Sequence, residues 1–283
     1  MLLPLPVHDV QIFAEGLDHP ECIVYHPDGS LWAGGEAGQI YHISPQGVVE
    51  EVANTGGFIL GIALSPKRDW LAVCDLKKKC IWKLEIASLE LTLFAQDADG
   101  HKFNIPNFIC FDKNENLYVS ESGEFRKVLG KLLKFDKDGK GSIWSAGPFN
   151  FANGLVINKE EDFIYVVCTF YPSIERVRIN KDGSAGERET FVTFHESVPD
   201  GLAFDAEGNL LVSCYSPNKI FTISPDRSIR VLIEDWEAHT LCNPTNIAFG
   251  GEKFDQLFVA NLGRWHISCI NVRVKGLPLV CHL

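Results

Sequence analysis

Pro199-Asp200-Gly201-Leu202 is a short motif in which a polar residue stands at the head of an apolar run, and the chain repeats it. The same pattern occurs at Pro20-Glu21-Cys22-Ile23, Pro106-Asn107-Phe108-Ile109, Ala152-Asn153-Gly154-Leu155 and Pro244-Thr245-Asn246-Ile247. A degenerate sixth copy is Ile59-Leu60-Gly61-Ile62, identified by its apolar positions. The second residues of the six motifs are separated by 39, 47, 46, 47 and 45 positions. A near-constant period of about 40–50 residues is typical of a β-propeller, in which each repeat forms one blade.

Each repeat continues with three more β-rich runs after its motif. In the first repeat, the turn Pro27-Asp28-Gly29-Ser30 precedes a strand, and residues 39–43 and 48–52 supply two more. Gly, Asn and Asp at such turns adopt the backbone angles that hairpins require. Four antiparallel strands repeated six times predict an all-β fold, a six-bladed β-propeller with four-stranded antiparallel blades. The repeat covers almost the whole chain, so we expect a single domain over residues 1–283.

The two ends of the chain bear on how the ring closes. Residues 10–16 resemble residues 230–235, the outer strand of the fifth repeat, but no inner strands precede them. We therefore predict that this N-terminal strand completes the sixth blade, because closure removes the exposed sheet edges of an open array. Residues 277–280 are the alternative candidate for the same place.

The composition of the chain argues against some kinds of partner and indicates a cellular compartment. The net charge of −11 argues against a nucleic-acid partner, because proteins bind the phosphate backbone with basic patches. No apolar run approaches the roughly 18 residues of a membrane span, and the proline-broken N-terminus lacks the basic region of a signal peptide. Nine cysteines without an export signal indicate free thiols in a reducing compartment. We expect a cytoplasmic protein without a membrane or nucleic-acid partner; its oligomeric state is open.

The repeated motif also predicts a site. The innermost strand of every blade runs beside the propeller axis, so residues at equal positions in different repeats converge there. This column consists of Glu21, Leu60, Asn107, Asn153, Asp200 and Thr245. Two carboxylates and two amide oxygens suit a hard divalent cation, with Ca²⁺ preferred over Mg²⁺ or Mn²⁺, and the absence of Cys and His makes Zn²⁺ a weaker candidate. The alternative is that these residues serve only as turn formers at strand heads.

Two further residues are candidate substrate contacts. His266 could line the channel, although a lone histidine on a strand is more often packed in the structure. Glu121 follows the second strand of the third repeat, where it could support the site from behind or be solvated. Residues 121–129 form a longer insertion at this point, of the kind that often lines a site.

The motifs resemble those of the senescence marker protein, gluconolactonase and luciferin-regenerating enzyme family, which includes the regucalcins. The resemblance covers nearly the whole chain and rests on Pro20-Glu21, Ile105-Pro106-Asn107, Ala152-Asn153-Gly154-Leu155, Pro199-Asp200-Gly201-Leu202-Ala203 and the stretch from Thr245 to Gly251. It implies a six-bladed propeller with one divalent metal in its channel and lactone hydrolysis as an activity.

The resemblance also implies roles for the column. Glu21, Asn153 and Asp200 would be direct metal ligands, Asn107 a ligand or substrate contact, and Asp200 also the catalytic acid/base. Family members that act on sugar lactones often carry an arginine two residues before the Asn107 position and an acid just after it. Here these places hold Ile105 and Phe108, which favours a less polar lactone or ester.

Three functions follow from these observations. The first is a metal-dependent lactonase or esterase acting on a small molecule, with Asp200 as base or nucleophile. The second is a non-catalytic calcium-binding propeller that binds a small ligand or a protein, since propellers serve both uses. The third is a phosphotriesterase-like hydrolase. No nucleophile elbow or Ser-His-Asp order is evident, which disfavours a serine esterase.

Overall fold

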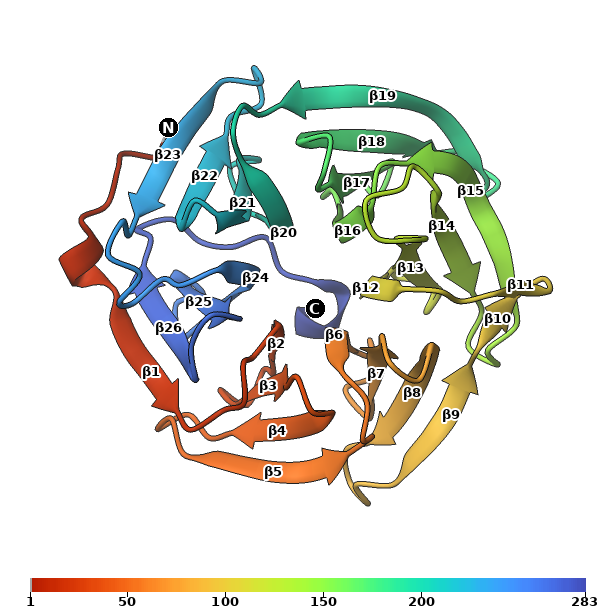
Figure 1. Ribbon diagram of the computed structural model, residues 1–283, viewed down its shortest axis with the longest axis horizontal. Helices are drawn as coiled ribbons and strands as arrows, with labels where there is room; N and C mark the ends of the chain where they lie inside the picture. The colour runs from red at the N-terminus through yellow and green to blue at the C-terminus, as the bar shows by residue number, and fades with distance from the viewer. Residues whose placement is uncertain (1) are drawn as a thin grey trace.

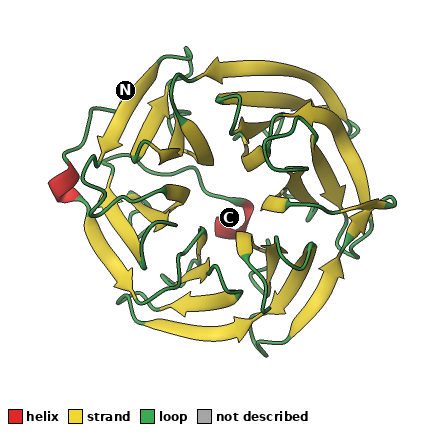
Figure 2. Ribbon diagram, viewed as in Figure 1, coloured by secondary structure: helices red, strands yellow, loops and turns green. Residues whose placement is uncertain are grey.

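The computed structural model describes residues 2–283 and forms a ring of six four-stranded antiparallel sheets around a central axis (Figure 1). Nearly all regular structure is β-strand, and the two helices are single 3₁₀ turns, η1 (Val7–Asp9) and η2 (Val280–His282) (Figure 2). The prediction of a six-bladed all-β propeller is confirmed. Within residues 2–283 no helix is long and apolar enough to cross a membrane.

In five blades the strands follow one another in chain order from the axis to the rim. The first two blades are β2 (Cys22–Tyr25), β3 (Leu31–Gly34), β4 (Gln39–Ile43), β5 (Val49–Asn54) and β6 (Ile59–Leu64), β7 (Trp70–Asp75), β8 (Cys80–Glu85), β9 (Leu91–Ala95). The third and fourth are β12 (Pro106–Phe111), β13 (Leu117–Glu121), β14 (Gly130–Phe135), β15 (Gly141–Phe149) and β16 (Ala152–Ile157), β17 (Phe163–Cys168), β18 (Ser173–Ile179), β19 (Ala185–Thr193). The fifth is β20 (Val198–Phe204), β21 (Leu210–Ser216), β22 (Lys219–Ile223), β23 (Ile229–Glu234). A small hairpin, β10 (Asp97–Ala98) and β11 (His101–Lys102), precedes the third blade.

The sixth blade joins the two ends of the ring. It consists of β24 (Pro244–Gly250), β25 (Gln256–Asn261), β26 (His266–Asn271) and, at the rim, β1 (Gln11–Glu15). β1 pairs antiparallel with β26, from Gln11 opposite Cys269 to Glu15 opposite His266. The predicted closure by the N-terminal strand is therefore confirmed. The alternative, in which residues 277–280 fill this place, is wrong because that segment lies across the middle of the ring (Figure 1).

Six clusters of buried apolar side chains hold the ring together, and each lies between two neighbouring blades. Between the third and fourth blades, for example, Tyr118 and Leu132 pack with Leu155 and Val166. The sheets are hydrophobic on both faces because each face packs against a neighbour. The nine cysteines are all free thiols, as predicted, and five are wholly or almost wholly buried among these clusters.

Deleting residues 1–16 should destabilise the whole ring, because it exposes the edge of β26 and removes the buried Val10 and Ala14. We expect thermal unfolding to shift down by roughly 5 °C or more, since each kcal/mol is worth about 2–4 °C at this size. Deleting only residues 1–4, which precede β1, is the control. A melting temperature equal to that of the control would contradict closure by β1.

Candidate functional site

The column residues lie where the inner strands are locally irregular. In five blades the pairing of the inner strand with its neighbour shifts register across the column position, as between Pro106 and Ile109 or between Pro199 and Leu202. In the first blade Glu21 lies just before β2 begins. Such bulges release a residue from the ladder and redirect its side chain. The repeated bulge therefore explains why one residue per blade can depart from the regular alternation of its strand.

Glycines bring the inner strands close together at this level. A Cβ atom on Gly61 would lie 2.5 Å from the carbonyl oxygen of Asn107 in the next blade. A Cβ on Gly154 would collide with the carbonyl of Asp200, and one on Gly201 with that of Thr245. Each glycine directly follows a column residue and leaves room for the backbone of the next column residue. The column is consequently a compact ring of neighbouring groups.

Two hydroxyl groups fix the orientation of the column amides. Asn153 Nδ2 donates to Thr169 Oγ1 at 3.2 Å, and Thr169 Oγ1 donates to the Pro199 carbonyl at 3.0 Å. Because a hydroxyl has one proton and Thr169 uses it on Pro199, Thr169 can only accept from Asn153. The Asn153 amide nitrogen must therefore face Thr169, and its oxygen Oδ1 faces away.

The third blade uses the same arrangement. Asn107 Nδ2 donates to Ser122 Oγ at 3.0 Å, and Ser122 Oγ donates to the Ala152 carbonyl at 2.6 Å. Both bridges reach the backbone of the following blade, so they also tie neighbouring blades together. Ser122 and Thr169 follow the ends of β13 and β17 and were missed by the sequence analysis. Their signal in the sequence is a hydroxyl residue at the same position of two repeats.

The two column carboxylates share an unfavourable environment. Burial, and then the negative charge of Asp200, raise the pKa of Glu21 well above its usual value. Burial also raises the pKa of Asp200, an effect that a hydrogen bond with Asn153 partly offsets. Such shifts mean that the site destabilises two simultaneous negative charges unless a cation or a proton compensates. The structure therefore brings Glu21, Asn153 and Asp200 together.

Two oxygens of this group have no hydrogen-bond partner. Glu21 Oε2 and Asn153 Oδ1 are buried and unpaired, whereas nearly all buried polar atoms in proteins are paired. Oxygen donors with two carboxylates fit a divalent cation such as Ca²⁺. No group of three or more His, Cys, Asp or Glu side chains that could hold a metal occurs in residues 2–283. The column supplies two carboxylates, and amides would have to complete the set.

Glu121 lies fully buried at the end of β13, so the solvated role considered for it is wrong. Its Oε1 accepts from the backbone N–H groups of Asn104, Ile105 and Gly123 at 3.0–3.2 Å. These bonds hold the segment that leads into Asn107. Glu121 Oε2 is buried without a partner. Glu121 thus supports the column from behind, and contact with substrate stays a prediction.

His266 lies at the start of β26, the third strand of its blade rather than the innermost. Its Nε2 bonds to the Thr240 carbonyl at 3.1 Å, and burial lowers its pKa. The contacts of His266 are those of a packed side chain, and its role towards substrate stays a prediction.

Exposed aromatic residues lie on the column face of the third to sixth blades. The second strand of each blade ends beside the start of the inner strand, so the loops that follow second and fourth strands lie on the column side. All five exposed aromatic residues of the described chain, 37–81% accessible, lie in these loops or at the end of β21. This aromatic rim consists of Phe125, Tyr171, Tyr215, Trp236 and Trp265.

Two members of the aromatic rim stand close to the column. Phe125 packs edge-on against Phe170, with ring centroids 4.9 Å apart, and against Phe151 at 5.7 Å. Phe151 directly precedes the motif that contains Asn153. The pKa of Tyr215 is raised by burial and then by the charges of Glu21 and Asp200. The sequence analysis did not identify Tyr215, which lies near the end of β21 and directly follows Cys214 as Thr169 directly follows Cys168.

These features define a six-bladed propeller whose axis carries a compact ring of carboxylate and amide groups under an aromatic rim. The family model described as the SMP-30/Gluconolactonase/LRE-like region matches residues 19–262. This chain belongs to that family, as the sequence motifs indicated.

Similar proteins carry names that refer to different functions. Strictosidine synthase-like protein 6 of Arabidopsis thaliana is 24% identical over 216 residues, which cover 70% of this chain and 56% of that protein. The gluconolactonase of Zymomonas mobilis is 24% identical over 208 residues, covering 66% and 56%. This chain therefore spans little more than half the length of these relatives. The solved structure of regucalcin from Agrobacterium tumefaciens, a calcium-binding protein, is 16% identical, with a TM-score of 0.77 and coverage of 99% and 98%.

Replacing Thr169 by valine should weaken divalent-metal binding without unfolding the ring. The substitution keeps the shape but removes the hydroxyl that orients the Asn153 amide. Loss of an interaction that orients a ligand typically costs about 10–100-fold in affinity. Calorimetric Ca²⁺ titration measures this, with Thr190→Val on the exposed face of β19 as the matched control. Equal affinities in the two variants would show that the Thr169 bridge does not support a ligand.

Metal-free protein should lose stability as pH rises from about 4, the ordinary pKa of a carboxyl group, to about 7, the raised pKa of Asp200. Because their pKa values are raised, Glu21 and Asp200 keep their protons in the folded state at pH values where the unfolded chain has released them. Protonation of these two groups therefore favours folding at low pH. This contribution to stability is lost as the pH rises through the folded pKa values. The slope is at most about 1.4 kcal/mol per pH unit for each group. Urea unfolding across this range, compared with the Glu21→Gln/Asp200→Asn double variant, measures the effect. Parallel pH profiles would contradict it.

Proposed function

We propose that this protein is a divalent-metal-dependent hydrolase that opens a lactone or a related ester. The observation that carries this proposal is the pair of buried, partnerless oxygens, Glu21 Oε2 and Asn153 Oδ1, beside Asp200 at the axis. Membership of the gluconolactonase-containing family and the name of the Zymomonas relative support lactones as the substrate class.

Glu21, Asn153 and Asp200 would hold the cation, and Asn107 would be a fourth ligand or a substrate contact. Ca²⁺ is the preferred ion, because carboxylate and amide oxygens suit hard cations and a solved structure of the same fold is described as calcium-binding. Mg²⁺ and Mn²⁺ are alternatives with the same oxygen preference, and Zn²⁺ is a weaker one. A bound cation would supply electrostatic stabilisation of the negative charge that develops on the substrate carbonyl oxygen.

Asp200 would act as the general base. Its pKa is raised by burial, which makes its carboxylate a better proton acceptor at neutral pH than an ordinary aspartate. In this mechanism an Asp200 carboxylate oxygen takes a proton from the attacking water and later returns it to the leaving alkoxide oxygen of the opened ring. Thr169 and Ser122 accept hydrogen bonds from the amide nitrogens of Asn153 and Asn107 and so fix the orientation of the two amides.

The substrate would be less polar than a sugar lactone. Ile105 precedes the Asn107 position and Phe108 follows it, so neither neighbour offers a charged group to sugar hydroxyls. The aromatic rim adds apolar surface around the approach to the column. Apolar and aromatic walls favour substrates that carry alkyl or aryl groups.

Metal-stripped protein should hydrolyse lactones only after a divalent ion is restored. Proton release from γ- and δ-lactones with alkyl substituents, and from gluconolactone for comparison, measures the activity with Ca²⁺, Mg²⁺, Mn²⁺ or Zn²⁺ added back. We expect Ca²⁺ to restore turnover and alkyl lactones to exceed gluconolactone in kcat/KM. Phenol release from aryl phosphotriesters without lactone turnover would favour the phosphotriesterase alternative. Metal binding with no turnover of either class would favour a calcium-binding propeller.

Asp200→Asn should reduce turnover by about 10²–10⁴-fold at saturating metal, because an amide cannot accept the proton. Glu21→Gln should chiefly weaken metal affinity, so that excess metal restores much of its turnover. Asp226→Asn, on an exposed turn, is the matched control. Near-normal kcat in Asp200→Asn would remove Asp200 from the acid/base role.

A further inference from the structure

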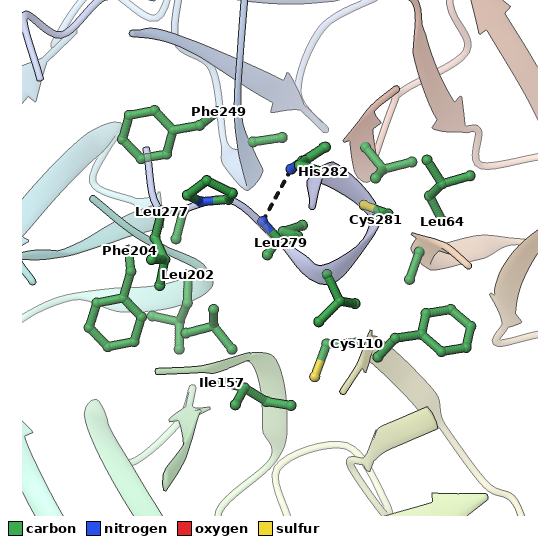
Figure 3. A pocket seen from close by; sticks show the side chains of 18 of the residues that line it. Leu64, Cys110, Ile157, Leu202, Phe204, Phe249, Leu277, Leu279, Cys281 and His282 are labelled. Carbon is green, nitrogen blue, oxygen red and sulfur yellow. Dashed lines mark hydrogen bonds between the residues drawn. The ribbon is translucent and has the colours of Figure 1, made fainter. Parts of the chain in front are cut away.

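A cavity of about 140 Å³ lies inside the ring at the end opposite the column (Figure 3). The inner strands run from the column to the cavity, so its walls are formed by residues a few positions further along each of them. Wall side chains from these strands are Leu64, Cys110, Ile157, Leu202, Phe204 and Phe249. The wall is predominantly apolar, in contrast to the column.

The C-terminal segment, residues 277–283, closes the other side of the cavity, and we call it the strap. Leu277, Leu279 and Cys281 of the strap line the cavity together with the inner strands (Figure 3). The strap extends past Gly276, which pairs with Asp205 in an isolated bridge. It therefore reaches the axis from the fifth and sixth blades.

The strap is anchored at its two ends. Leu277 N donates to the Phe204 carbonyl at 2.9 Å, and the Arg68 guanidinium Nε donates to the Cys281 carbonyl at 2.7 Å. His282 Nε2 bonds to the Tyr25 carbonyl at 2.9 Å. These bonds fix where the strap begins and ends over the cavity.

The middle of the strap is held differently. The N–H of Leu279 donates to His282 Nδ1, and the Leu279 carbonyl accepts from the His282 N–H, so both bonds stay within the strap (Figure 3). Leu279 is also 42% exposed. A segment with few bonds to the body of a protein opens at low free-energy cost. Opening of the middle of the strap, at Leu279, is thus the expected route by which a ligand enters the cavity.

We propose that this cavity is a second binding site, distinct from the column, for a small uncharged apolar molecule of about the size of one six-membered ring. A cavity of about 150 Å³ lined by Leu, Ile and Phe is known to remain free of water and to bind benzene or xenon. The cavity here has a similar volume and a mostly apolar lining, to which Lys159, Glu161 and a few neutral polar side chains also contribute. A charged or strongly polar ligand would lose its hydration against such walls without compensation.

This proposal does not depend on lactone hydrolysis or on a bound metal. The column and the cavity use different parts of the inner strands, and the cavity ligand needs no chemistry. Binding can therefore be measured on full-length protein whatever the outcome of the lactone assays.

Uptake of toluene by the full-length protein, measured by headspace partitioning, tests the site, with 1,4-dioxane as a polar ring of similar size. We expect saturable binding of one toluene per chain and no saturable binding of dioxane. Ile157→Phe should fill the cavity and weaken toluene binding at least tenfold. Ile143→Phe, the same change on the outer strand β15, where Ile143 is 39% exposed, should leave binding unchanged.

A second cavity-filling variant keeps the proposal testable if Ile157→Phe does not fold. Leu279→Trp fills the cavity from the half-exposed strap, and circular dichroism and melting curves show whether each variant is folded. We expect this folded variant also to bind toluene at least tenfold more weakly. Absence of saturable toluene uptake by the unaltered protein, equal uptake of dioxane, or unchanged binding in a folded filling variant would each overturn the proposal.

Discussion

The close approach of the inner strands at the axis is the constraint on which the rest of the structure depends. Gly61, Gly154 and Gly201 leave no room for a side chain beside the backbone of the next blade. The bulges at the same level take the column residues out of regular pairing. Backbone carbonyls that face this junction are bonded by hydroxyls, such as Thr169 to Pro199. Convergence and redirection thus come from the same short motif, so the fold and the site cannot be varied independently.

This convergence places the negative charges of Glu21 and Asp200 close together, which is electrostatically unfavourable. The buried carboxyl group of Glu21 lies near that of the half-buried Asp200, and the charge of Asp200 raises the pKa of Glu21. The amides beside them are held by hydroxyls that leave the oxygen of Asn153 unpaired. A site that served only to form turns would gain nothing from unpaired buried oxygens, whereas a cation site requires them. In the proposed cation site, side chains held in this way would lose little conformational entropy when an ion binds.

Much of the fold could be predicted from the sequence because a period near 46 residues in the column requires only counting, and the N-terminal strand could be assigned from its similarity to residues 230–235. The supporting residues were harder to predict. Ser122 and Thr169 act through single hydrogen bonds to a neighbouring blade, and such contacts depend on blade packing rather than on a pattern along the chain. Glu121 could not be distinguished from a solvated residue because two of its three backbone partners, Asn104 and Ile105, lie in the segment before its own blade. The strap lies outside the six repeats, so no other repeat could indicate its position. Its place is known from the structure, in which it covers the cavity.

The two ends of the ring differ in polarity because the inner strands change character along their length. Each has a column residue at or just before its start and continues with apolar residues, so the Glu21 and Asp200 carboxyls gather at one end and the mostly apolar cavity forms at the other. The strap lies across the apolar end (Figure 1), and the aromatic rim lies on the other face, over the third to sixth blades. A molecule that reaches the column therefore approaches from the face with the aromatic rim. In the proposed hydrolase, selection among substrates would then depend on the loops of this face, such as the one that carries Phe125.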